Sequence, residues 1–149
     1  MRVLLTADAV GGVWTYATDL ADGLAAAGVE ATLAVLGPDE GRTAGAGVET
    51  IALPDVALDW LAESEDEVLA GAERLAAVAE RLDVDLIHLN NPALAAGGAF
   101  RRPVLGVCHS DVATWWAAVR GGPLPADLAW RAGLTGRSYA ACDALLAPT

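Results

Sequence analysis

Short, mainly apolar runs alternate with longer segments of helical spacing along the chain. Runs of strand length occupy residues 2–7, 30–36, 48–53, 85–90, 103–109 and 144–148, and several of them end at proline, glycine or a polar residue. The runs at 85–90 and 103–109 have the apolar composition that is typical of buried strands in a parallel sheet. We therefore predict six strands, separated by helices and loops.

Apolar residues recur at helical spacing in three of the intervening segments. The first helix is predicted from Val13 to Gly28, since glycine favours the left-handed position that follows a helix. Ser64 begins the second helix, because Glu67 follows it at the spacing of a capping box. Pro125 begins a third helix that runs to about residue 141.

This alternation predicts an α/β fold with a Rossmann-like, doubly wound and mostly parallel sheet flanked by helices. The length of 149 residues fits a single domain over residues 1–149. The glycine-rich coil at residues 37–47 is interpreted as a surface loop. In such a fold, ligands bind beyond the carboxyl ends of the strands.

Charge and composition exclude several classes of protein. The formal net charge is −11, and no basic cluster is larger than Arg101 and Arg102, so the chain lacks the footprint of a nucleic-acid-binding protein. No apolar run approaches the length that spans a membrane. Cys108 and Cys142 have no CxxC spacing and are interpreted as free, buried thiols. We expect a cytoplasmic protein without a transmembrane segment or a nucleic-acid partner.

The first predicted strand ends in a loop of residues 8–12 that contains Gly11 and Gly12 and precedes a helix. The two glycines would let an anion approach backbone N–H groups at the helix terminus. They would equally serve a tight turn that needs a positive φ, and the residues alone leave both interpretations open. A GxGxxG fingerprint is absent, which disfavours a nicotinamide-dependent oxidoreductase.

His109 is the candidate catalytic residue. It stands at the predicted carboxyl end of the fifth strand, beside Ser110, where an α/β fold places its reacting groups. The alternative is a structural histidine that is hydrogen-bonded to a backbone carbonyl. His88 lies inside a strand, so packing in the core is the better interpretation for it.

Polar and aromatic residues near the strand ends are candidates for binding a sugar. Asn90 and Asn91 could hydrogen-bond a sugar hydroxyl or cap the next helix. Trp14 and Trp115, together with other aromatic residues near them, could form a wall for a sugar face or simply pack against the core. Ser110 is the third polar candidate.

Several segments together resemble the amino-terminal domain of family 4 glycosyltransferases, in their order and spacing. They are the glycine pair Gly11 and Gly12, LADGLAAAG at 20–28, DLIHLNN at 85–91, VCHS at 107–110 and DALLAPT at 143–149. Each segment is weakly specific alone, and the resemblance spans the whole chain. It does not indicate any one sugar.

The resemblance implies one half of a GT-B fold, in which two Rossmann-like domains face each other across a cleft. It implies a retaining transfer from a nucleotide-sugar donor to an acceptor that this half presents, without a cofactor or a catalytic metal. Gly11 and Gly12 would lie near the pyrophosphate of the donor, and His109 near the transferred sugar.

The sequence ends at Thr149, before the donor domain of the family. We therefore expect a chain that is inactive alone, because its partner domain or subunit supplies the donor site. Its uncovered surface would favour self-association. A stand-alone, non-catalytic Rossmann-like binding module is the alternative.

Overall fold

A computed structural model describes residues 1–149 except 10, 39–40, 46 and 149, so Val10 in the predicted glycine loop and the terminal Thr149 lie outside the described residues. Six strands form one sheet in the order β3-β2-β1-β4-β5-β6, and every pairing is parallel. The strands are β1 (Arg2–Asp8), β2 (Glu30–Leu36), β3 (Glu49–Leu53), β4 (Leu86–Leu89), β5 (Val104–Val107) and β6 (Ala144–Leu146). The predicted Rossmann-like fold is confirmed.

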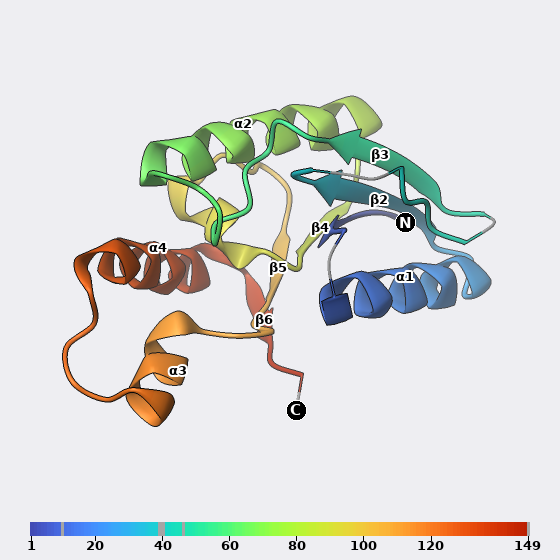
Figure 1. Ribbon diagram of the computed structural model, residues 1–149. Helices are drawn as coiled ribbons and strands as arrows, with labels where there is room; N and C mark the ends of the chain where they lie inside the picture. The colour runs from blue at the N-terminus through green and yellow to red at the C-terminus, as the bar shows by residue number, and fades with distance from the viewer. Residues whose placement is uncertain (10, 39–40, 46, 149) are drawn as a thin grey trace.

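Helices cover both faces of this sheet (Figure 1). They are α1 (Gly11–Ala26), α2 (Glu65–Leu82), the 3₁₀ helix η1 (Pro92–Gly97), α3 (Val112–Val119) and α4 (Ala126–Ala141). Helix α1 lies on one face, and α2, η1 and α4 lie on the other. Because β1 sits beside both β2 and β4, the direction of winding reverses between β1 and β4, which is where such sheets bind ligands.

The two cores follow from the alternation of side chains along β1. Val3 and Leu5 pack with α1, whereas Leu4 packs with α2, and all three are at most 2% exposed. Helix α2 begins as predicted: the Oγ of Ser64 accepts a hydrogen bond from the backbone N–H of Glu67 at 3.3 Å. Three acidic residues in its first turn complement the helix dipole.

Helix α3 and helix η1 were not predicted from the sequence. Helix α3 is short and almost entirely apolar, so no apolar stripe stands out against a polar face in its sequence, and it buries none of its residues. Its start is nevertheless specified locally, since Oδ1 of Asp111 accepts a hydrogen bond from the backbone N–H of Thr114 at 2.7 Å. Strand β5 ends at Val107, so His109 lies in the loop just beyond the strand rather than on it.

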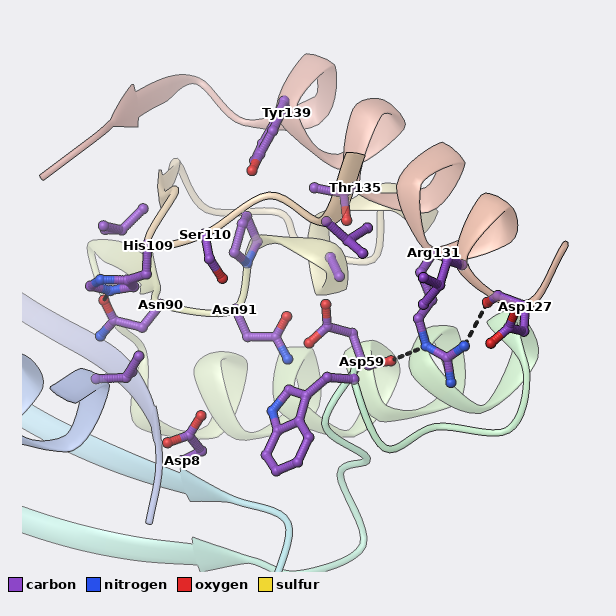
Figure 2. Close-up of a pocket in the computed structure, with 17 residues that line it drawn as sticks. Asp8, Asp59, Asn90, Asn91, His109, Ser110, Asp127, Arg131, Thr135 and Tyr139 are labelled. Carbon is purple, nitrogen blue, oxygen red and sulfur yellow. Dashed lines mark hydrogen bonds between the residues drawn. The ribbon is translucent and has the colours of Figure 1, made fainter. Parts of the chain in front are cut away.

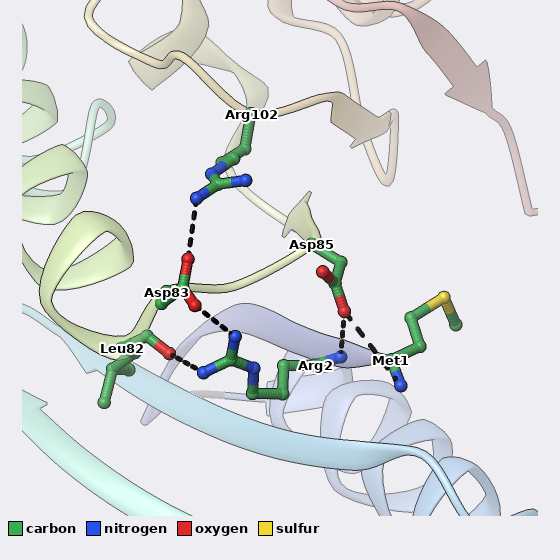
Figure 3. Close-up of polar contacts among 6 residues, drawn as sticks. All are labelled: Met1, Arg2, Leu82, Asp83, Asp85 and Arg102. Atoms are coloured by element: carbon green, nitrogen blue, oxygen red, sulfur yellow. Dashed lines mark hydrogen bonds and ion pairs between the residues drawn. The ribbon is translucent and has the colours of Figure 1, made fainter.

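A polar cluster joins the amino ends of the central strands (Figure 3). Asp83, in the left-handed conformation at φ 49°, pairs with Arg2 and also with Arg102 at 2.8 Å. The hydrogen bond from Arg2 lowers the pKa of the Asp83 carboxyl below its ordinary range. Asp85 accepts a hydrogen bond from the backbone N–H of Arg2 at 2.7 Å. These contacts join the start of β1 to the end of α2 and to the segments that lead into β4 and β5, at the end of the sheet away from the site.

Strand β6 forms one side edge of the sheet, and this edge is apolar and exposed. All three residues of β6 are exposed, and the side chains of Leu145 and Leu146 are each 46% exposed. This agrees with the uncovered surface expected from the sequence, while self-association itself stays a prediction. Within the described residues, no helix is both long and apolar enough to cross a membrane.

Candidate functional site

A pocket of about 450 Å³ lies at the carboxyl ends of the strands, beside the point where the winding reverses (Figure 2). It is built from the ends of β1, β4 and β5, the loop that follows β3, and one side of α4. Its polar lining residues are Asp8, Asp59, Asn90, Asn91, His109, Ser110, Asp127, Arg131, Thr135 and Tyr139. The fold therefore brings together four of the candidate residues predicted from the sequence. They are Asn90 and Asn91, which follow β4, and His109 and Ser110, which follow β5.

His109 is held by a buried asparagine. Its Nε2 lies 2.8 Å from Oδ1 of Asn90, which is only 7% exposed. The Nδ2 of Asn90 donates to the carbonyl oxygen of Thr6 at 2.7 Å, and this fixes which end of the amide accepts. Because Oδ1 can only accept, Nε2 of His109 must carry the proton, and the neutral ring keeps Nδ1 as its acceptor atom.

The ring of Tyr16 packs between the two histidines. It meets His109 edge-on at 4.9 Å between ring centroids and stacks on His88 at 6.2 Å. Burial lowers the pKa of His109 below its ordinary value, and the negative charge of Asp8 partly offsets this shift. Burial also lowers the pKa of His88, which is only 4% exposed. Both rings are therefore neutral near pH 7, and His88 belongs to the core, as interpreted from the sequence.

Gly11 and Gly12 differ in their backbone conformation. Gly11 has φ +67°, so it serves the tight turn that opens α1. Gly12 has no positive φ, and a Cβ added there would meet no described atom within 4 Å. The fold around β1 and α1 therefore needs glycine at position 11 but not at position 12. Neither glycine lines the pocket.

The remaining predicted residues are placed as follows. Asn91 sits at the amino-terminal cap of η1, but its side chain makes no capping hydrogen bond and instead lines the pocket. Trp14 packs against the core under α1, with the guanidinium of Arg42 5.6 Å from its ring centroid. Trp115 is 48% exposed on α3. Neither tryptophan lines the pocket, and the interpretation that one of the aromatic residues contacts a sugar stays a prediction.

The half of the pocket opposite His109 was not predicted from the sequence. There the carboxyl of Asp59, in the loop after β3, faces Asn91 and lies beside Arg131 of α4 (Figure 2). Burial raises the pKa of Asp59, although backbone N–H groups, Arg131 and the side chain of Asn91 all partly oppose the shift. The signal that could have found it is its place after a strand, on the edge that carries Asn90 and His109.

Among the described residues, no cluster of three or more His, Cys, Asp or Glu side chains could hold a metal ion. The expectation of metal-free chemistry remains a prediction. Cys108 and Cys142 are free and partly buried, and the hydroxyl of Tyr139 donates to Sγ of Cys108 at 2.8 Å.

The chain belongs to glycosyltransferase family 4, whose family model matches residues 10–149. No curated protein matches the chain by sequence. Among solved structures, sucrose-phosphate synthase from Thermosynechococcus elongatus is similar with a TM-score of 0.73 and 18% identity, over 97% of this chain and 41% of that one.

Two further similar structures are glycosyltransferases with a bound nucleotide. Arabidopsis thaliana UGT89C1, complexed with UDP, has a TM-score of 0.58 and 14% identity over 99% of this chain and 42% of that one. SsfS6 from Streptomyces sp. SF2575, complexed with thymidine diphosphate, has a TM-score of 0.52 and 23% identity over 99% of this chain and 48% of that one. The fold is that of one half of a GT-B glycosyltransferase, and the chain spans less than half of each of these relatives.

Proposed function

We propose that residues 1–149 form the acceptor-side half of a retaining glycosyltransferase that moves a sugar from a nucleotide-sugar donor to an acceptor. The observation that carries this proposal is the His109–Asn90 pair. A family 4 chain here holds a neutral histidine in a fixed orientation inside a pocket, at the position in the sheet where Rossmann-like folds bind ligands.

The amino terminus of α1 would face the diphosphate of the donor. Its first turn carries no acidic residue, whereas the first turn of α2 carries three, so no carboxylate within α1 offsets the positive end of its helix dipole. Gly12 leaves open space beside this terminus, although the backbone conformation does not require glycine there. The relatives that bind UDP and thymidine diphosphate support a nucleoside diphosphate as the leaving group.

His109 would position the transferred sugar. With its Nε2 proton committed to Asn90, the neutral ring offers Nδ1 as an acceptor for a sugar hydroxyl. As the glycosidic bond breaks, positive charge grows on the sugar ring and negative charge on the diphosphate. Alignment of the acceptor, the anomeric carbon and the leaving oxygen then sets the rate, so the orientation of His109 matters more than its basicity.

A donor-binding domain, on the same polypeptide or on a second subunit, would complete the site. It would supply the positive charge that neutralises the leaving diphosphate, since Arg131 is the one fixed cation among the described lining residues of the pocket. We call residues 1–149 together with such a domain the two-domain enzyme.

The test compares the 149-residue chain with the two-domain enzyme, using UDP-sugars and TDP-sugars and an assay of nucleoside diphosphate release. We expect release and transfer only from the two-domain enzyme, with the anomeric configuration retained when the product is examined by NMR. Turnover by the pure 149-residue chain would contradict the division of roles. Nucleotide binding by the two-domain protein without any transfer would favour the non-catalytic binding module.

A further inference from the structure

The end of the pocket that lies away from His109 is lined by carboxyl and amide side chains. Asp59 and Asn91 face each other there, and Asp127 lines the same end from α4 (Figure 2). The amide and the carboxyl come from different segments, and the fold holds the carboxyl in place through hydrogen bonds from backbone N–H groups. The pair offers both donors and acceptors to a bound molecule.

The charge of the lining is predominantly negative. Three carboxylates line the pocket, from Asp8, Asp59 and Asp127, and Arg131 is the one arginine among the lining residues that the structure describes. His109 adds no charge near pH 7, because burial lowers its pKa. Because Asp59 and Asp127 both lie at the end away from His109, the field at that end opposes an anionic ligand.

Arg131 offsets only part of this negative charge, and its guanidinium is already held by the protein. Its Nε donates to the carbonyl oxygen of Asp59 at 3.1 Å, and its two terminal nitrogens donate to the carbonyls of Asp127 and Ala62, each at 2.6 Å. Three of the five N–H donors of the guanidinium are thus engaged in joining α4 to the loop after β3. A phosphate or carboxylate could use only the two N–H groups that remain.

We propose that this end of the pocket binds the acceptor, and that it selects a hydroxyl-rich acceptor that carries no phosphate or carboxylate group. Asp59 accepts hydrogen bonds from its hydroxyls, and Asn91 both donates and accepts. This inference rests on the proposed function and adds the class of acceptor to it. An anionic group on the acceptor would lie among like charges, which costs at least about tenfold in affinity.

The test is an NMR titration of the 149-residue chain with glucose, galactose and mannose, and with their 6-phosphates at constant ionic strength. We expect at least one neutral sugar to shift the amide signals of Asn91 and its neighbours, and to bind at least about tenfold more tightly than its 6-phosphate. Asp59→Ala should weaken neutral-sugar binding. Asp59→Asn keeps an acceptor oxygen and the shape of the side chain but removes the negative charge. It should therefore reduce the difference in affinity between the neutral sugar and its 6-phosphate.

Asp55→Ala provides the matched control, because Asp55 is an exposed residue of the same loop that does not line the pocket. A 6-phosphate that binds as tightly as its neutral sugar would overturn the inference, as would neutral-sugar binding that is unchanged in Asp59→Ala. Absence of binding by all three neutral sugars would also count against it.

The same inference can fail independently of the proposed function. Transfer to a phosphorylated acceptor by the two-domain enzyme would remove the acceptor class and leave the glycosyltransferase proposal standing. Neutral-sugar binding at Asp59, combined with no transfer from any nucleotide sugar, would support the sugar-binding site and contradict the glycosyltransferase proposal.

Discussion

The Nε2 of His109 lies 2.8 Å from Oδ1 of Asn90, across the ends of two neighbouring strands. Since the amide of Asn90 is itself fixed by Thr6, this contact sets both the orientation and the protonated nitrogen of the ring. The geometry thus gives His109 one defined acceptor atom for a ligand.

This contact makes the pKa of His109 sensitive to position 90. In Asn90→Asp, a negative charge beside the Nε2 proton should raise the pKa of His109 by about one unit or more. NMR titration of the ring protons measures this directly, because the chain contains only two histidines. The matched variant Asn91→Asp should produce a smaller shift. Equal shifts in the two variants would contradict the hydrogen bond.

His88 should contribute to stability. It is 4% exposed, stacks on Tyr16 and has no hydrogen-bond partner for either ring nitrogen among the described residues. His88→Ala should lower the free energy of unfolding by about 2–4 kcal/mol, because it leaves a cavity. His88→Leu should cost much less, since it fills the space and removes unsatisfied polar atoms. Denaturant unfolding of both variants is the measurement, and equal losses would indicate a polar role for the ring.

Much of this architecture could be predicted from the sequence, because buried parallel strands are mainly apolar and loops at their ends carry glycine and polar residues. The predicted placement of Asn90 and His109 followed from that rule. The same rule could have pointed to Asp59, which follows β3, but it could not predict the contact of Asp59 with Arg131, because the two residues are 72 positions apart and no local pattern encodes that contact. Helix α3 was not predicted because its short sequence is almost entirely apolar and therefore shows no amphipathic periodicity.

Gly12 should matter for the donor and not for the fold. In the two-domain enzyme, Gly12→Val should weaken binding of the nucleoside diphosphate, because the side chain would fill the space beside the terminus of α1. Gly23→Val is the matched control, since Gly23 lies in the same helix with equally open surroundings. Calorimetric titration with UDP and TDP measures the difference. Equal affinity in both variants would mean that the diphosphate does not approach Gly12.

The exposed edge at β6 should cause self-association of the 149-residue chain despite its charge of −11. Leu146→Lys should reduce this association, because it places a charge on the edge strand where Leu146 is 46% exposed. Leu61→Lys makes the same change at a residue that is 53% exposed and lies outside the sheet. Sedimentation velocity over a range of concentrations compares them, and a monomeric wild-type chain at high concentration would refute the prediction.

The most direct test of the proposed function is the turnover of His109→Ala in the two-domain enzyme. A positioned polar group of this kind contributes roughly 10²-fold or more, so turnover should fall by that factor while nucleotide binding changes less. His88→Ala, measured in parallel, should retain turnover in proportion to the folded fraction. Near-normal turnover in His109→Ala, together with its loss in a folded His88→Ala, would contradict the placement of the transferred sugar beside His109.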